Sequence, residues 1–413
     1  MKITIINHSD NRGGAAIVSF RLMEALRRAG HDAVMLVAHK YTDSPHVYAV
    51  GPKWRLDSAF VAEHLQILAG NGLRRRDMFK VSTAAFGMPL SRHPLMLDAD
   101  AVMLNWVNQG MLSLREIARI AGAKPTVWTM HDMWCMTGVC HYAGVCTRFT
   151  ATPGCGCCPE LHSSSRRDLS RRTWSRKVDA YARRRIHFVA VSHWLKGLAT
   201  QSSLMRGQRV DVIPNAFPVD SFYINPRSSR ASLGLPEGKK IMIMSAARLD
   251  VPVKGLDLAI DALNRLDRTD AIALFVGALR DPHALDNLRF PHMAYGAVSD
   301  PALLRELYAH STVLMSTARY ETLPTTLIEG QAAGCTPVAF DSSGQCDIIS
   351  NADEGILVPS FDTSAYAAAL ERALDAPLEP SALRASVERR YAANRVADEY
   401  LALLGRITDG AGR

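Results

Sequence analysis

The run from Tyr320 to Gly330 (YETLPTTLIEG) carries two glutamates, Glu321 and Glu329, around a predicted helix start. The apolar segment before it predicts a strand, and Pro324 favours a first helical turn. At about 1.5 Å per residue the carboxylates would lie on the order of 9 Å apart, which suits two hydroxyl-bearing parts of one extended ligand. The free amides of the helix start favour a phosphate there. Glutamates also complement a helix dipole without binding anything, but the whole segment favours a ligand.

Two basic residues follow an apolar run earlier in the sequence. Arg248 and Lys254 lie in the loop after residues 240–245 (KIMIMS). An arginine fork and a lysine point charge can together hold a diphosphate and stabilise it as a leaving group. A solvated basic loop is the alternative interpretation.

Six of the eight cysteines lie between residues 135 and 158, with the spacing Cys140-x5-Cys146-x8-Cys155-x2-Cys158. Four thiolates suit a closed, tetrahedral structural zinc site, and a catalytic zinc is disfavoured because every ligand would come from the protein. Cys157 could compete with Cys158. Paired thiols and unlinked thiols remain the alternatives to zinc.

The composition is that of a globular chain. Of 413 residues, 48% are hydrophobic and 21% charged, which excludes a mainly disordered protein. A net charge of +8 fits an anionic substrate, an anionic membrane surface or nucleic acid. The first residues do not resemble a signal peptide and no run of about 18 apolar residues occurs, so we expect a cytoplasmic protein.

Short apolar runs alternate with helical patterns in both halves of the chain, which predicts two doubly wound α/β domains with sites beyond their strand ends. Proline and serine residues after Asn215 indicate a linker. The loop after the first strand (HSDNRGGAA) has adjacent Gly13 and Gly14 but no third glycine at the dinucleotide-binding spacing. This disfavours a nicotinamide oxidoreductase.

Between Arg166 and Arg185 basic residues outnumber acidic ones, and Trp174, Val178 and Tyr181 recur at helical spacing. Such a helix can lie on an anionic membrane surface. Equally, its apolar stripe can face the protein core. Nucleic acid is disfavoured because no recognised binding fold surrounds the segment.

These motifs resemble those of a known family. The segment 320–334, with Arg248, Lys254-Gly255 and Pro337-Val338, resembles the donor-binding half of retaining glycosyltransferases of family 4, which have the two-domain GT-B fold. The resemblance continues through residues 213–215 and 295–296. The first half is similar to the colanic-acid-type branch of bacterial polysaccharide synthesis, through residues 104–108, 128–134 and 158–159.

The resemblance implies roles for individual residues. Glu329 would bind the nucleotide ribose, and Glu321, with Thr322 and Leu323, would face the donor sugar. Arg248 and Lys254 would clamp the diphosphate. His131 would lie beside the donor sugar. Gly13 and Gly14 would belong to a loop whose backbone closes over the reaction centre. Gly296, with Thr317 and Thr322, would shape the pocket for the base and the sugar. Asn105 departs from the family, which often has histidine there, and Arg248 and Lys254 are one residue further apart than in many members.

The predicted function is therefore a retaining glycosyltransferase without a catalytic metal. It would move a hexose from a nucleoside-diphosphate sugar to a lipid-linked glycan in bacterial polysaccharide synthesis, at the inner face of the plasma membrane. We expect two Rossmann-like domains facing across a cleft: 1–215 on the acceptor side with a Cys-rich insert at 135–160, 216–380 for the donor, and a last helix in 381–413 returning to the first domain. A GT-B sugar-nucleotide epimerase and a non-enzymatic, zinc-stapled glycan- or nucleotide-binding protein are the alternatives.

Overall fold

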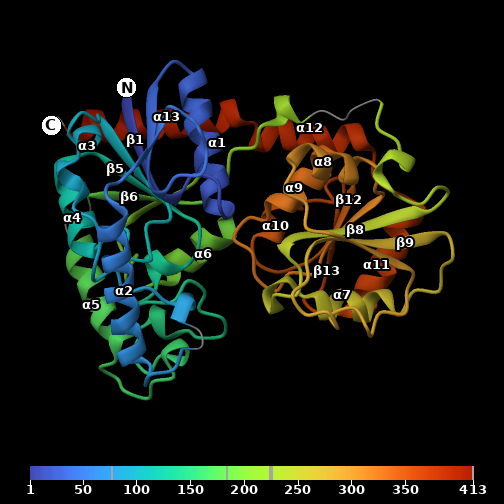
Figure 1. Ribbon diagram of the computed structural model, residues 1–413, viewed down its shortest axis with the longest axis horizontal. Coiled ribbons are helices and arrows are strands. Elements are labelled where there is room, and N and C mark those ends of the chain that lie inside the picture. Colours follow the sequence, from blue (N-terminus) through green and yellow to red (C-terminus); the bar gives the residue numbers. More distant parts are fainter. Residues whose placement is uncertain (76–77, 183–184, 223–226, 412–413) are drawn as a thin grey trace. The chain divides into compact units, whose positions relative to one another are not determined.

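The computed structural model describes residues 1–75, 78–182, 185–222 and 227–411 (Figure 1). The chain forms two compact units. The first contains Met1–Ala216 and Ala393–Arg413, and the second contains Phe217–Ala392. Each unit is built on its own parallel sheet.

The sheet of the first unit has the order β3-β2-β1-β4-β5-β6-β7, and its neighbouring strands pair in parallel. Its inner strands are buried almost throughout because helices cover both faces of a doubly wound sheet. The strands are β1 (Lys2–Ser9), β2 (Asp32–His39), β3 (Val47–Ala49), β4 (Ala101–Leu104), β5 (Thr126–Met130), β6 (Ile186–Ala190) and β7 (Arg209–Val212).

Side-chain caps begin several helices of this unit. Ser113, Asp168 and Ser192 each accept a backbone N–H in the first turn of the helix that follows. The helices are α1 (Gly14–Arg28), α2 (Lys53–Gly70), α3 (Pro94–Leu97), α4 (Leu114–Ala123), α5 (Leu169–Tyr181), α6 (His193–Gln201) and α13 (Ala393–Ala411).

The sheet of the second unit has the order β10-β9-β8-β11-β12-β13, again paired in parallel. Its strands are β8 (Lys240–Arg248), β9 (Ala271–Ala278), β10 (His292–Gly296), β11 (Val313–Ser316), β12 (Thr336–Phe340) and β13 (Ile356–Val358). Its helices are α7 (Leu256–Leu263), α8 (Pro301–Ala309), α9 (Thr325–Ala332), α10 (Gln345–Ile348), α11 (Thr363–Asp375) and α12 (Pro380–Tyr391). The predicted pair of doubly wound α/β domains is confirmed.

The last segment differs from the single helix predicted for it. Helix α12 ends at Tyr391 and α13 begins at Ala393, because Ala392 has an extended backbone (φ −52°, ψ 134°). Helix α12 packs on α9 within the second unit, whereas α13 lies beside α1 within the first (Figure 1). The second unit therefore runs to residue 392, past the predicted limit of 380.

In both sheets the strand order reverses between two central neighbours, β1 and β4 in the first and β8 and β11 in the second. Loops leaving such a pair at its carboxyl edge diverge and create a crevice, which is where doubly wound folds bind ligands. In the described part of the chain, no helix is both long and apolar enough to cross a membrane.

We predict that Leu403→Ala lowers the free energy of unfolding of the first unit by about 2–5 kcal/mol, because this α13 side chain is fully buried in the unit's core. All six tryptophans lie within residues 54–194, so tryptophan fluorescence during urea denaturation reports this unit alone. The exposed Asp398 of the same helix supplies the control, since Asp398→Ala should change stability by less than about 0.5 kcal/mol. Equal stability of the two variants would contradict a core role for α13.

Candidate functional site

In the second unit, the predicted cation Lys254 contacts the predicted carboxylate Glu321 at the crevice between β8 and β11. Lys254 ends a short 3-10 turn (Pro252–Lys254) after β8, and Glu321 lies in the loop between β11 and α9. The ammonium of Lys254 donates a hydrogen bond to Oε1 of Glu321. Both side chains stay partly exposed, at 32% and 20%, so a ligand can reach the pair. Because the glutamate neutralises the lysine, the pair can remain partly buried without a ligand.

The two loops that carry this pair are fixed to each other. Thr317 Oγ1 donates to the carbonyl of Gly255 at 2.8 Å. Gly255 has a left-handed backbone (φ 69°), and a Cβ there would meet the Thr317 carbonyl oxygen at 2.0 Å. Arg319 adds a bidentate ion pair with Asp257, at 2.9 and 2.6 Å. Only glycine at position 255 permits this approach of the two backbones.

A third loop, after β12, supports Glu321 from the other side. The backbone N–H of Glu321 donates to Ser343 Oγ at 3.1 Å, and its carbonyl accepts from Gly344 N–H at 2.8 Å. Gln345 is fully buried, accepts from Ser316 Oγ at 2.6 Å and donates to the Ala318 carbonyl at 3.0 Å. The backbone around Glu321 is thus braced by the loops on both sides.

Arg248 is held by a residue that the sequence interpretation did not select. Its guanidinium donates to both oxygens of Asp250, at 2.6 and 3.3 Å. Asp250 also accepts the backbone N–H groups of Arg280 and Asp281, each at 3.0 Å. The hydrogen bond from Arg248, with those two amides, lowers the pKa of Asp250 to about 2. Asp250 therefore stays ionised and orients Arg248 at the end of β8.

The other residues predicted to bind the donor lie at the same edge of the sheet. Glu329 lies in the second turn of α9, and its charge reaches the buried Tyr308, whose pKa is raised by burial and by Glu329. Leu323 is buried and Thr322 is partly buried in the loop before α9. Gly296 is exposed at the carboxyl end of the edge strand β10. The structure thus places all predicted donor residues of this unit at the carboxyl ends of β8, β10 and β11.

In the first unit, Gly13 caps α1 with a left-handed backbone (φ 94°), and Gly14 begins the helix. Asp10, from the same loop, accepts the backbone N–H groups of Tyr41 and Thr42 at 2.9 Å each. The Thr42 hydroxyl adds a bond of 2.6 Å to the same carboxylate. Asp10 thereby ties the loop after β1 to the loop after β2.

His131 directly follows β5, and its Nε2 lies 2.8 Å from Oδ1 of Asn105, which follows β4. Burial lowers the pKa of His131 to about 4, although the charge of Asp132 opposes the shift. The imidazole is therefore neutral near pH 7 and donates its Nε2 hydrogen to Asn105. In the described structure Nδ2 of Asn105 is buried without a hydrogen-bond partner, which makes it a candidate donor to a ligand.

Behind His131 lies a buried chain of polar side chains that the sequence interpretation missed. Asp132 Oδ2 is 2.6 Å from His141 Nδ1 and accepts from Trp106 Nε1 at 3.0 Å. The other ring nitrogen of His141 lies 3.1 Å from Ser82 Oγ. Burial raises the pKa of Asp132, but His141 and the hydrogen bonds that Trp106 and Trp134 donate outweigh burial, so the pKa is lowered. Ser82 has no exposed surface, so the chain supports the His131 loop and offers no accessible nucleophile.

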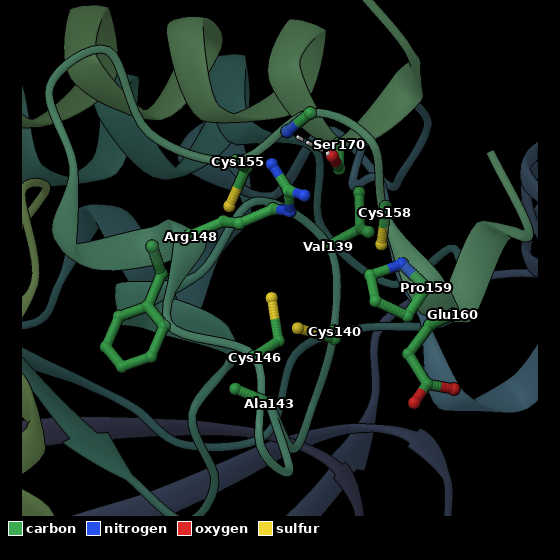
Figure 2. A pocket seen from close by; sticks show the side chains of 12 residues that line it. Val139, Cys140, Ala143, Cys146, Arg148, Cys155, Cys158, Pro159, Glu160 and Ser170 are labelled. Atoms are coloured by element: carbon green, nitrogen blue, oxygen red, sulfur yellow. Dashed lines mark hydrogen bonds between the residues drawn. The ribbon is translucent and has the colours of Figure 1, made fainter. Parts of the chain in front are cut away.

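The four cysteines predicted as zinc ligands, Cys140, Cys146, Cys155 and Cys158, line one pocket (Figure 2). None of the eight cysteines forms a disulfide. Among the described residues, no three His, Cys, Asp or Glu side chains already lie close enough together to hold a metal ion. Cys157 does not line the pocket, and its thiol donates to the Ser164 carbonyl at 3.1 Å.

The basic segment 166–185 does not present the apolar stripe predicted for a membrane helix. Trp174 and Tyr181 of α5 are buried in the first unit, and only Val178 is exposed. Trp174 Nε1 donates to Ser203 Oγ at 3.0 Å, and the Tyr181 hydroxyl to the Cys135 carbonyl at 3.3 Å. The structure instead agrees with the alternative interpretation, in which α5 is a surface helix whose apolar stripe faces the core.

Two family models cover most of the chain. Residues 12–221 match Glycosyltransferase Family 4, and residues 226–390 match Glycosyl transferases group 1. The first match alone spans just over half of the sequence. The chain therefore belongs to glycosyltransferase family 4.

A curated relative and several solved structures are also similar to this chain. A D-inositol 3-phosphate glycosyltransferase of Gordonia bronchialis is 30% identical over 186 residues, so the match spans 41% of this chain and only 40% of that protein. Sucrose-phosphate synthase of Thermosynechococcus elongatus has a TM-score of 0.67 at 16% identity, covering 99% of both chains. Anabaena Alr3699/HepE, solved with UDP, has a TM-score of 0.60 at 15% identity, covering 98% of this chain and 100% of its own. The fold is GT-B and the protein is a glycosyltransferase, while the colanic-acid branch stays a prediction.

We predict that the first unit loses stability as the pH falls from 7 to 5.5. Burial lowers the pKa of His131 to about 4, and burial together with the charge of His39 lowers that of His8 to about 4. Between these values and the unfolded value of about 6.5 the unfolded chain binds more protons, so acid favours unfolding by up to about 1.4 kcal/mol per pH unit for each histidine. Asp132, with its lowered pKa, stays ionised in this window.

Urea denaturation followed by tryptophan fluorescence at the two pH values measures the effect. His131→Gln should weaken the pH dependence, because one of the two histidines with the most strongly lowered pKa is removed. Equal stability of the wild type at pH 7 and pH 5.5 would contradict the burial of neutral histidines.

Proposed function

We propose that this glycosyltransferase takes its sugar from a nucleoside diphosphate and transfers it with retention of anomeric configuration. The contact between Lys254 and Glu321 at the β8–β11 crevice carries this proposal, because it sets a cation that can meet phosphate beside a carboxylate that can accept sugar hydroxyls. Arg248 is the last residue of β8, and the start of α9 adds backbone amides.

The chemistry follows from where charge develops. As the bond between the anomeric carbon and the diphosphate oxygen breaks, positive charge grows on the sugar and negative charge on the diphosphate. Lys254 and Arg248 would stabilise the departing diphosphate, which is electrostatic preorganisation. The acceptor hydroxyl attacks from the face that the diphosphate leaves, and its proton passes to a diphosphate oxygen. Glu321, released from Lys254 when phosphate binds, would hold sugar hydroxyls.

The first unit is proposed to bind the acceptor, through His131 and Asn105 at the carboxyl edge of its own sheet. Nδ2 of Asn105 and Nδ2 of Asn108 are both buried without a hydrogen-bond partner in the described structure. A buried amide left unpaired costs free energy, which an acceptor hydroxyl would recover. UDP-glucose is the first donor to test, because Anabaena Alr3699/HepE, similar in fold, is solved in complex with UDP-glucose. A hexose donor is part of this proposal.

We propose further that the acceptor is a lipid-linked glycan of polysaccharide synthesis and that α2 contacts the membrane. Trp54, Val61 and Leu65 lie on one helical face and are 66%, 52% and 59% exposed. Three large apolar side chains exposed on one helical face are a candidate contact surface. Phe79, after the helix, is also exposed.

Exposed basic side chains lie near both ends of α2, and Lys53 pairs with Asp57 at 2.7 Å. Lys53 and Arg55 are exposed in its first turn, and Arg74 and Arg75 are exposed shortly after its end. Apolar side chains flanked by exposed cations are typical of an anionic lipid surface. The membrane contact predicted for residues 166–185 is thereby proposed for α2 instead, because the apolar stripe of α5 is buried.

A thermal-shift series with UDP, GDP, ADP and dTDP tests the donor proposal. One nucleotide at about 100 times its dissociation constant should add about 2.7 kcal/mol of stability. Glu329→Ala should abolish the shift, whereas Glu371→Ala, at an exposed position on α11 of the same unit, should keep it. If no nucleotide stabilises the wild type, the donor proposal is wrong.

Lys254→Ala should lower transfer by more than about a hundredfold, because a donor to the developing diphosphate charge is lost, while the fold measured by circular dichroism stays intact. Transfer is followed as nucleotide release together with glycan product. Wild-type turnover in this variant would contradict the assigned role. Donor turnover without any glycan product would favour the epimerase alternative.

Sedimentation with vesicles of phosphatidylcholine and phosphatidylglycerol tests the membrane proposal. The double variant Trp54→Glu/Leu65→Glu should bind at least about tenfold more weakly, since it removes two apolar side chains from the lipid interface. The matched control Arg172→Glu/Arg176→Glu changes exposed residues of α5 and should reduce binding less. A larger effect of the α5 variant, or no binding of the wild type at low salt, would contradict a role for α2.

A further inference from the structure

The segment from Thr137 to Asp168 is long and irregular for a compact unit. Its only regular pieces are two short 3-10 turns, Arg148–Thr150 and Pro159–Leu161. Connections of this length without helix or strand need another source of order. The segment links β5 to α5, and it contains the four thiols that share one pocket.

Two parts of this segment supply the cysteines that line the pocket. Figure 2 shows Cys140 and Cys146 on one side of the space and Cys155 and Cys158 on the other, with their sulfur atoms turned into it. Cys140 and Cys158 are buried, and the other two are partly buried. Four thiols facing one small space are the complete ligand set of a structural zinc site.

The backbone from Cys155 to Cys158 has the shape needed to present two thiols together. Cys155, Gly156 and Cys157 have left-handed φ values of 60°, 87° and 48°, so the chain reverses tightly between the two lining cysteines. A Cβ at Gly156 would meet the Arg166 carbonyl oxygen at 2.6 Å, so the turn is pressed against the following chain. Left-handed conformations are costly for cysteine and persist where surrounding structure imposes them, often at ligand sites.

One hydrogen bond and one buried cation near the pocket would stabilise thiolates once a metal is bound. The backbone N–H of Gly138 donates to Cys155 Sγ at 3.1 Å. Lys177 lies fully buried beneath the same segment, where its ammonium donates to the carbonyls of Trp134 and of Thr137, the latter at 3.0 Å. No carboxylate pairs with Lys177 among the ion pairs of the described chain. A zinc ion with four thiolates carries a net charge of −2, which a nearby buried ammonium would partly balance.

We infer that Cys140, Cys146, Cys155 and Cys158 bind one structural Zn²⁺. Binding would release the thiol protons and draw the four sulfur atoms inward to about 2.3 Å from the metal. The irregular segment can make this movement because no helix or strand ladder within it has to break. The inference is independent of the proposed transferase reaction.

The site would also support the predicted catalytic loop. Cys140 pairs with Val81 in an isolated antiparallel bridge, and the next residue, His141, contacts Asp132 beside His131. The backbone N–H of Ser82 donates to the Val139 carbonyl at 2.8 Å. A metal at Cys140 would therefore hold the strand-like piece that carries His141, and so fix the polar chain behind His131.

Elemental analysis of the full-length protein, purified without chelators from zinc-supplemented medium and desalted, tests the inference. We expect one zinc per chain in the wild type and loss of that zinc in Cys146→Ser and Cys158→Ser. Cys157→Ser is the matched control: it changes a thiol of the same turn that faces the Ser164 carbonyl, and it should keep its zinc. Absence of zinc from the wild type would overturn the inference, as would loss from Cys157→Ser with retention in Cys158→Ser.

A second measurement uses only the wild type, in case the variants do not fold. Titration with a mercurial reagent, with released zinc followed by a chromogenic chelator, should free the zinc as four thiols react. Zinc release that requires fewer thiols, or disulfides among these four cysteines in the purified protein, would overturn the inference.

Discussion

The chemistry proposed for the second unit depends on one close approach of two backbones. The loop after β8 meets the loop after β11 where Gly255 passes the Thr317 carbonyl, and a Cβ would fit only by moving one of them. That approach sets Lys254 beside Glu321 and leaves both partly exposed. A second glycine, Gly344, approaches the Thr322 carbonyl just as closely from the loop after β12. The geometry of the Lys254–Glu321 pair therefore depends on glycine at positions 255 and 344.

The first unit positions its loops by a different means, with buried carboxylates that each accept several donors. Asp10 joins the loops after β1 and β2, and Asp132 joins Trp106, Trp134 and His141. A buried carboxylate is tolerable only where such bonds replace water. Because each carboxylate accepts several donors, removing one donor would leave the other loops anchored to the shared acceptor.

The sequence predicts most strands of both sheets because they are apolar runs, but not the edge strands β3 and β10, which are short or half exposed. It predicts the donor loops because they follow apolar strands. Asp250 was not selected because its role comes from Arg280 and Asp281, which approach it only after β9 has formed beside β8. His141 was missed for a similar reason, since its contacts with Asp132 and Ser82 come from residues 9 and 59 positions away. The break between α12 and α13 falls at Ala392, a residue with no tendency to end a helix, and packing on two different units decides it.

Helix α2 shows how hydrogen bonding can override an apolar pattern. Its Glu63 is fully buried and accepts the backbone N–H groups of Thr83, Ala84 and Gly110, at 2.6, 2.9 and 2.6 Å. With Glu63 facing inward, helical spacing forces Trp54, Val61 and Leu65 outward. Burial of each of these would otherwise add roughly 1.5–3 kcal/mol of stability. Satisfying three buried amides therefore leaves an apolar face in solvent, and a lipid surface is the environment in which that face would regain its stabilisation.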